Sequence, residues 1–370
     1  MRDFAAANPW LGEYALYRAL KARFDQAAWF DWPDKALRDH APAALAAARQ
    51  ELAEDIAFHQ AVQFWFFSQW KALKDHANGL GVRIIGDLPI YVSLDSADVW
   101  AHPELFQLDE ENLTPLKVSG VPPDAFSEDG QLWGNPLYDW EKMKQTDFAW
   151  WRSRMKASAK LYDAVRIDHF IGVVQYYAIP YGAVTAKDGE WEKGPGKKLT
   201  DALDEAAGET KIIAEDLGVF CQEVKDLLAE TGYPGMKIIE FAFSGDRFNE
   251  HLPHCYDPNS VVYGGTHDNE TLAGYFKPEK RQWWELQYIA DYLGAAHQSE
   301  VVDRVFRAAY GSVASVAIFQ MQDVLKLDNW ARMNTPGTLG ENWRWRLVPG
   351  QFTDERADYL SWLVDTFGRF

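Results

Sequence analysis

The chain has 370 residues, of which 47% are apolar and 15% aromatic, so it contains enough apolar material for a large hydrophobic core. Its 55 acidic and 37 basic side chains give a formal net charge of −18, which argues against nucleic acid or another phosphate-rich partner. The N-terminus lacks the apolar core of a signal peptide, and no run approaches the roughly 18 apolar residues of a membrane span, so we expect a cytoplasmic globular protein.

The N-terminal part of the chain, residues 1–80, is predicted to be a helical region. Residues from about 8 to 79 read as helical: the stretch from Leu45 to His76 is rich in Ala, Leu, Gln, Glu and Lys, with apolar side chains at helical spacing, until Gly79 and Gly81 end the run. Residues 82–92 then read as a buried strand, and Pro89 marks its end because proline cannot donate to a ladder of strands. This region is interpreted as scaffold.

A long irregular insertion is expected over residues 93–140. It is dense in Pro, Gly, Asp and Trp, and its centre, residues 118–138, contains the sequences GVPPDAF and LWGNPLY. A loop of this length inside a compact domain is usually functional or disordered, and its aromatic content argues against disorder. We therefore interpret residues 118–138 as a lid or substrate loop.

The remaining chain alternates helices and strands. Helices are predicted at about 140–161, 199–207, 220–230 and 279–310, a polar loop at 186–198, and either a strand or a buried helix at 313–324. About six strands are expected, near positions 83, 164, 211, 236, 261 and 315, and their alternation with helices implies parallel βαβ units. The predicted fold is an α/β barrel of the (β/α)₈ type within a single catalytic domain, 1–370. Because such a barrel needs eight strands, two units are missing from this count.

Three of the predicted strands run directly into acidic residues. Asp168, Glu215 and Asp268 each follow a β-rich segment, and unpaired buried charge is costly unless it faces a site. Cleavage of a glycosidic bond with retention needs one carboxylate as nucleophile and one carboxylic acid as proton donor, about 5 Å apart. Arg166 shares a strand face with Asp168 and can hold it ionised. The joint pattern predicts a sugar-processing site, with Glu215 as the acid if burial or a neighbouring negative charge raises its pKa.

Each of these residues also has a simpler interpretation. A lone aspartate after a strand is most often a helix cap, and His169 or His267 alone would more often be a hydrogen-bonded structural group than a ligand or base. The pair His251 and His254 resembles part of a metal site, but Pro253 lies between them and no third ligand is close in sequence, so we predict no metal. The only two cysteines are far apart in the sequence, which predicts neither a disulfide framework nor a zinc site.

Four segments in chain order closely resemble the ordered motifs of the 4-α-glucanotransferases, also called amylomaltases or disproportionating enzymes, which are relatives of the α-amylases. They are GDLPIYV (86–92), VRIDHF (165–170), IAEDLG (213–218) and GTHDNE (265–270). The insertion sequences GVPPD (120–124) and WGNP (133–136) resemble the insertion of that family. Further matches are PGMK (234–237), ARMN (331–334), PG (336–337) and ENW (341–343). The resemblance extends over essentially the entire chain.

The resemblance implies specific roles. Asp168 would be the nucleophile that forms a glucosyl-enzyme intermediate, Glu215 the acid and then the base, and Asp268 the stabiliser of the transition state. Arg166 would orient Asp168, the loop between Pro122 and Trp133 would cover the cleft, and neither a metal nor a cofactor would be needed. The substrate-binding residues implied are Arg166, His169, His267, Asp87, Asp124, Trp133, Asn135 and Asn269. The partners implied are maltooligosaccharides, amylose or glycogen-type glucans.

One departure from the family affects these expectations. Family members carry an additional N-terminal segment that includes the first two barrel strands, and nothing in this sequence matches it, so we expect an incomplete barrel. Three hypotheses follow: a glucanotransferase, a hydrolase that uses the same three carboxylates with water as acceptor, and a glucan-binding fragment without turnover. The sequence does not distinguish chain-length preference, formation of cyclic glucans, the ratio of transfer to hydrolysis, or oligomeric state.

Overall fold

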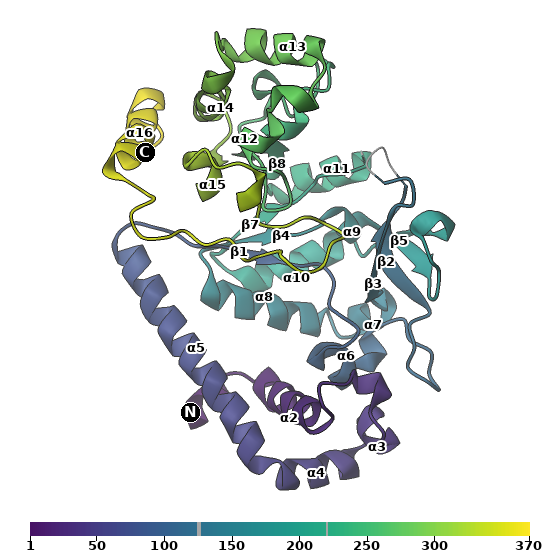
Figure 1. Cartoon of the computed structure of the whole chain (residues 1–370). Coiled ribbons are helices and arrows are strands. Elements are labelled where there is room, and N and C mark those ends of the chain that lie inside the picture. Colours follow the sequence, from purple (N-terminus) through teal and green to yellow (C-terminus); the bar gives the residue numbers. More distant parts are fainter. Residues whose placement is uncertain (124–126, 220) are drawn as a thin grey trace. The chain divides into compact units, whose positions relative to one another are not determined.

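The computed structural model describes residues 1–123, 127–219 and 221–370. The chain divides into two compact units, Met1–Leu227 and Leu228–Phe370, and each is described by itself. Figure 1 shows the elements of both units along the chain. Within the described residues, no helix is both long enough and apolar enough to cross a membrane.

The first unit begins with the predicted helical region. Its helices are α1 (Arg2–Ala6), α2 (Trp10–Arg23), α3 (Lys35–Arg38), α4 (Pro42–Glu51) and α5 (Ala53–Gly79). The expectation of helix from residue 8 to 79 is therefore confirmed in outline, with breaks between the helices. Large aromatic side chains fill this part of the core, since Trp29, Trp32 and Trp100 are at most 1% exposed. The apolar side chains of α5 do not all face a core, because Phe58 and Trp65 are more than half exposed.

A three-stranded parallel sheet in the order β1-β4-β7 is the centre of the first unit. It consists of β1 (Ile85–Leu88), β4 (Ala164–Ile167) and β7 (Lys211–Ala214). The register pairs Leu88 with Ile167, and Ile167 with Ala214, so all three strands end at the same level. Strand β1 is less buried than predicted: only every second residue is covered, because β1 lies at the edge of this sheet.

Several helices accompany this sheet. They are α6 (Ala97–Ala101), α7 (Trp140–Gln145), α8 (Ala149–Leu161), α9 (Ile171–Val174), α10 (Lys197–Ala207) and α11 (Gln222–Thr231), the last of which spans the boundary between the units. Of these, α7, α8, α10 and α11 lie close to predicted positions, whereas α6 and α9 were not predicted. The single helix predicted at 140–161 is two helices. Phe148, between them, has a left-handed backbone conformation (φ 53°), which interrupts the helical path.

The insertion differs from the expectation of an irregular loop. It contains β2 (Lys117–Val121) and β3 (Gln131–Pro136), which pair antiparallel with each other. Strand β2 also pairs with β5 (Gln175–Pro180), and β5 pairs with β6 (Glu190–Lys193), giving the sheet order β3-β2-β5-β6. The polar loop predicted at 186–198 is therefore wrong in part, because it contains β6. Pairing with neighbouring strands overrides weak local strand preference in both segments.

The second unit contains another three-stranded parallel sheet, in the order β10-β9-β8. Its strands are β8 (Gly235–Ile238), β9 (Ser260–Tyr263) and β10 (Val316–Ile318), and its helices are α12 (Leu272–Tyr275), α13 (Trp283–Leu293), α14 (Val301–Tyr310), α15 (Met321–Val324) and α16 (Asp354–Phe367). For residues 313–324 the sequence predicted either a strand or a buried helix, and the segment contains both β10 and α15. All six predicted parallel strands are thus found in the two sheets.

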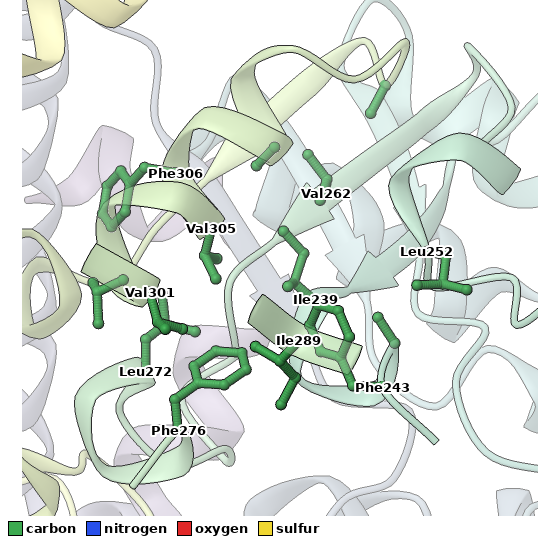
Figure 2. Close-up of a cluster of buried hydrophobic side chains, with 14 of the residues drawn as sticks. Ile239, Phe243, Leu252, Val262, Leu272, Phe276, Ile289, Val301, Val305 and Phe306 are labelled. Carbon is green, nitrogen blue, oxygen red and sulfur yellow. The ribbon is translucent and has the colours of Figure 1, made fainter. Parts of the chain in front are cut away.

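Packing in the second unit is dominated by one cluster of buried apolar side chains. Figure 2 shows Ile239 and Val262 from the sheet side facing Val305 and Phe306 of α14. The ring of Phe306 stacks on Phe319 at a centroid separation of 3.8 Å. This core supports the segment between β9 and α12, which carries His267 and Asp268.

Candidate active site

The C-terminal ends of β1, β4 and β7 bring four charged side chains together. Asp87 in β1 pairs in register with Arg166 in β4, and Asp168 and Glu215 follow β4 and β7. The ladder continues beyond the strands, because the Asp168 amide donates to Leu88 O (3.0 Å) and the Glu215 amide donates to Ile167 O (3.0 Å). The parallel register therefore places both predicted catalytic carboxyl groups at one edge of the sheet.

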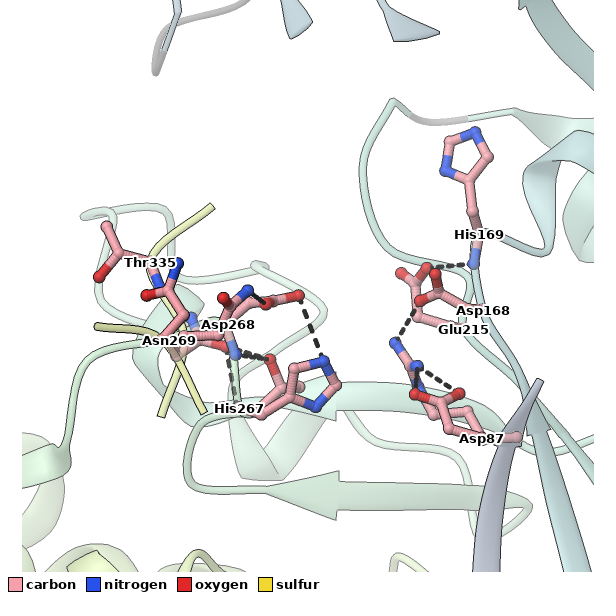
Figure 3. A network of polar contacts seen from close by, with 12 residues as sticks. Asp87, Asp168, His169, Glu215, His267, Asp268, Asn269 and Thr335 are labelled. Atoms are coloured by element: carbon pink, nitrogen blue, oxygen red, sulfur yellow. Dashed lines mark hydrogen bonds and ion pairs between the residues drawn. The ribbon is translucent and has the colours of Figure 1, made fainter. Parts of the chain in front are cut away.

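Arg166 joins two carboxylates at this edge. Its Nη1 lies 2.7 Å from both carboxylate oxygens of Asp87, and its Nη2 lies 2.9 Å from Oδ1 of Asp168 (Figure 3). Burial opposes the charge on Arg166, but the charges of Asp87 and Asp168 outweigh burial and raise its pKa. The guanidinium plane thus holds the Asp168 carboxylate in one orientation and places a positive charge beside it.

Glu215 has the opposite environment. Its side chain is buried, and its carboxyl oxygens accept hydrogen bonds from the backbone amides of His169 (2.7 Å) and Leu217 (2.9 Å). Burial and the negative charge of Asp168 raise the pKa of Glu215 to about 7, although Arg166 and the two amide donors oppose the shift. Glu215 can therefore hold a proton near neutral pH while its neighbour Asp168 is paired with a guanidinium group.

His169 connects the charged cluster at the ends of β1, β4 and β7 with the insertion. Its backbone is left-handed (φ 49°), a conformation that directs its amide to Glu215 while its ring turns toward β3. The ring meets Trp133 edge to face, with centroids 4.8 Å apart, and Tyr91 lies near both rings. Burial lowers the pKa of His169 to about 4, so its ring is neutral at physiological pH. Its Nε2 is buried and has no hydrogen-bond partner among the described residues.

In the second unit, the segment after β9 carries a separate polar group. Asp268 Oδ1 accepts a hydrogen bond from the Asn334 side-chain amide (2.6 Å), and Arg332 donates to the Asp268 carbonyl (2.5 Å). His267 Nε2 lies 3.5 Å from Asp268 Oδ2 (Figure 3). The His267 ring lies 5.0 Å from the ring of Trp343. Both His267 and Asp268 remain partly exposed.

Comparison with known proteins shows which family this chain resembles. A family profile described as 4-alpha-glucanotransferase matches residues 1–351. A 4-alpha-glucanotransferase from Clostridium butyricum is 46% identical over 360 residues, which is 97% of this chain and 74% of the relative. One from Thermus thermophilus is 44% identical over 366 residues, 97% of this chain and 73% of the relative.

The chain belongs to the 4-alpha-glucanotransferase family.

Solved structures agree with membership of the 4-alpha-glucanotransferase family. Amylomaltase from Streptococcus agalactiae in complex with acarbose has a TM-score of 0.95 and 41% identity, with 100% of this chain and 74% of that chain covered. Amylomaltase from Corynebacterium glutamicum, at 18% identity, shares the fold with a TM-score of 0.73 over 90% of this chain and 50% of that chain. The predicted resemblance, the enzyme class and the α/β fold of the TIM-barrel type are confirmed.

The residues predicted to bind substrate occupy several parts of this 4-alpha-glucanotransferase fold. Trp133 and Asn135 lie in β3, and Asn269 lies in the turn after β9. Asp124 lies outside the described residues. The rejected histidine pair has partners within the protein: His251 Nδ1 accepts from the Ile238 amide, and both ring nitrogens of His254 are hydrogen-bonded. The described part of the chain contains no group of three or more potential metal-ligating side chains.

Two residues of the 4-alpha-glucanotransferase site were given no role by sequence reasoning. Arg332 and Asn334 belong to the ARMN motif, which was noticed as a family match only. Arg332 contacts the backbone of Asp268 and Asn334 its side chain, and the Asn334 backbone N–H also donates to His267 O at 3.0 Å. The motif was the available signal. The role of Asn334 in this motif depends on its contact with Asp268, which lies 66 positions earlier in the sequence, and no local pattern reveals such a contact.

Replacing Arg166 with lysine is expected to lower kcat for glucan transfer by about 10²-fold. A lysine ammonium cannot bridge Asp87 and Asp168 with the planar fork that Arg166 supplies. Initial rates on maltotriose would measure the loss, with Arg152→Lys, an ion-paired surface arginine of α8, as the matched control. Equal rates in the two variants would contradict the orienting role of Arg166.

Proposed function

We propose that this family member transfers α-1,4-glucan segments by a retaining double displacement. In the first step the Asp168 carboxylate attacks the anomeric carbon of the donor, and the glycosidic bond to the leaving glucan breaks. Glu215 gives its proton to the departing oxygen, so the leaving glucan departs with a free 4-hydroxyl group. The observation that carries this proposal is the pairing of a guanidinium-bound Asp168 with a buried, proton-holding Glu215.

The second step reverses the roles of the two carboxyl groups. Glu215, now ionised, removes the proton from the 4-hydroxyl of an acceptor sugar, whose oxygen attacks the anomeric carbon. The bond to Asp168 breaks, the carboxylate is regenerated, and Glu215 is protonated again for the next turnover. Two inversions at the same carbon give retention overall, which requires the two carboxyl groups to lie about 5 Å apart.

Asp268 is proposed to stabilise the positive charge that develops on the sugar ring. Its carboxylate is held by the Asn334 amide and remains partly exposed, which suits a group that faces a developing cation. His169 and His267 are proposed to contact the donor sugar, together with the other predicted binding residues, Asp87, Asp124, Trp133, Asn135 and Asn269. Residues 1–370 are proposed to act as one catalytic domain.

The proposed substrates are maltooligosaccharides and longer α-1,4-glucans. The names of the relatives and the acarbose bound to the Streptococcus agalactiae amylomaltase support a glucan-type ligand. Segment 118–138 is proposed to cover the site, because Trp133 at its end contacts the His169 ring directly. Exclusion of water by this cover would favour a sugar hydroxyl as the acceptor.

Incubation with maltotriose alone is expected to give free glucose together with maltopentaose and longer oligomers. Transfer of a maltosyl unit to a second maltotriose releases one glucose and lengthens the acceptor, so the number of glycosidic bonds stays constant. Chromatography of the products and a reducing-end assay would measure both quantities. Accumulation of shorter sugars alone, with rising reducing ends, would instead identify a hydrolase. Binding of maltoheptaose without any product would identify a glucan-binding protein.

A further inference from the structure

A loop of the second unit, residues 332–343, holds His267 and Asp268 through both backbone and side chain. Arg332 donates to the Asp268 carbonyl (2.5 Å), and the Asn334 backbone N–H donates to the His267 carbonyl (3.0 Å). The Asn334 side-chain amide donates to Asp268 Oδ1 (2.6 Å). The loop therefore fixes its own position against the two residues that follow β9.

Hydrogen bonds within the loop hold its end beside its beginning. The Trp343 amide donates to Met333 O (2.7 Å), and Asn342 Oδ1 accepts from the Thr335 amide (3.0 Å). Asn342 Nδ2 donates in turn to the Thr338 carbonyl and hydroxyl oxygens (3.1 Å each). Trp343, at the end of the loop, is thereby held next to the residues that bind Asp268.

The side chain that the loop places beside His267 is that of Trp343. The two ring centroids lie 5.0 Å apart, with 44° between the ring planes. Trp343 has a φ of 64°, in the left-handed region that bulky residues rarely adopt. Such strain persists only where the surrounding contacts fix it, and it is concentrated at ligand-binding and active sites.

Much of the Trp343 side chain remains uncovered despite these contacts. Trp343 is 52% exposed, and the neighbouring His267 side chain is 33% exposed. Exposed tryptophans also occur elsewhere, as at Trp283 in α13, and exposure of a single apolar side chain indicates nothing by itself. Trp343 differs because the loop that holds its ring also holds the Asp268 carboxylate.

We propose that Trp343 is a glucan-binding residue, whose exposed ring forms a platform for a glucose unit next to the unit that His267 and Asp268 contact. A pyranose ring has an apolar face of C–H groups, and a flat indole ring can cover this face while the sugar hydroxyls stay in water. The inference rests on the proposed function, because that function places a glucan beside Asp268. It adds a binding residue that supplies neither charge nor proton to the reaction.

Binding of maltoheptaose to Trp343→Leu and Trp343→Phe tests the proposal. The comparison is made in the Asp168→Asn protein, so that the ligand is not consumed, and titration calorimetry measures Kd. Leucine keeps apolar bulk but removes the flat face, so we expect Kd to rise about 10-fold, whereas phenylalanine should keep Kd within about threefold. Trp283→Leu replaces a more exposed ring and is the matched control, which should leave Kd unchanged.

Initial rates on maltotriose separate binding from support of Asp268. With Asp168 intact, Trp343→Leu should raise KM about 10-fold and lower kcat by less than about threefold, because the lost contact is made equally in the bound substrate and in the transition state. A fall in kcat of about 10-fold or more, with KM and Kd unchanged, would show that Trp343 only supports the Asp268 loop. That result would overturn the inference.

Fluorine NMR of protein labelled with fluorotryptophan gives a readout that needs no activity. The Trp343 resonance, identified by its loss in Trp343→Phe, should shift when maltoheptaose is added, and the Trp283 resonance should stay in place. A Trp343 resonance that does not move would overturn the inference, even if Trp343→Leu fails to fold. If the wild type produces only shorter sugars from maltotriose, the proposed transfer function fails, whereas the Trp343 shift would still support the binding role.

Discussion

Asp168→Asn is expected to lower kcat for glucan transfer by roughly 10⁴-fold or more, the range associated with removal of a covalent nucleophile. The amide is nearly the same size as the carboxylate but cannot attack an anomeric carbon. The fold should persist, because Arg166 keeps its two contacts with Asp87 and the backbone amide of residue 168 still bonds Leu88 O. Initial rates on maltotriose would measure the loss of kcat, and thermal melting curves would measure whether the fold persists.

The opposite end of the same strand supplies the control for this experiment. Asp163 precedes β4 and accepts hydrogen bonds from the Ile84 amide and the Asn78 side chain, so it holds the chain and has no proposed chemistry. Asp163→Asn should therefore keep its activity. A slow fluorosugar donor should label the wild type at Asp168, as peptide mass spectrometry would show. Labelling at another residue would refute the assignment of the nucleophile.

Glu215→Gln is expected to lower kcat on maltotriose by about 10³-fold, because a sugar leaving group departs poorly without protonation. Maltosyl fluoride should lose much less, since fluoride leaves without a proton. The contrast between the two donors therefore isolates proton donation from every other function of the side chain. Glu209→Gln, an exposed substitution just before β7, is the matched control and should leave both rates unchanged.

The pH profile tests the same assignment. Burial and the charge of Asp168 raise the pKa of Glu215 to about 7, so the reactive, protonated form is present below pH 7 and is lost as the pH rises through that value. We expect kcat/KM of the wild type to fall on the alkaline side near pH 7. The fall should be absent from Glu215→Gln acting on maltosyl fluoride. An alkaline limb that persists in this variant would assign the titration to another group.

The linkage of this pKa to stability has a definite sign. A carboxyl group whose pKa is higher in the folded state than in the unfolded state contributes stability at low pH and loses it as the pH rises. The window for Glu215 runs from its ordinary value of 4.5 to about 7. Glu215→Gln should consequently become more stable relative to the wild type across this window.

Much of the strand layout could be predicted from sequence, because β4, β7 and β9 are short runs with β-branched residues that lead into polar segments. Val165 and Ile167 lead to Asp168, and Val261 and Val262 lead to the segment with Asp268. The hairpin in the insertion could not be predicted in the same way. Gln131–Pro136 contains Gly134 and Pro136, which disfavour strands, and it becomes a strand through pairing with Lys117–Val121.

In the candidate site, too, some features could be predicted from the sequence and others could not. Order along the chain and the family motifs identified Asp168, Glu215, Asp268 and Arg166, and their assigned roles remain predictions. Contacts between segments distant in sequence, such as the hydrogen bond from Asn334 to Asp268, were not predictable. Such contacts depend on which side chains the folded backbone brings within hydrogen-bonding distance, and nothing in the local pattern around residue 334 encodes the partner.

The sequence by itself determined which ionisable residues end the strands and which family they resemble. Only the tertiary structure decided how those groups are charged. Asp168 and Glu215 are both carboxyl groups after β-strands, yet one faces the Arg166 guanidinium and the other is buried beside a negative charge. The raised pKa of Glu215 follows from these surroundings, because the free energy of an ionised carboxylate depends on its solvation and on neighbouring charges.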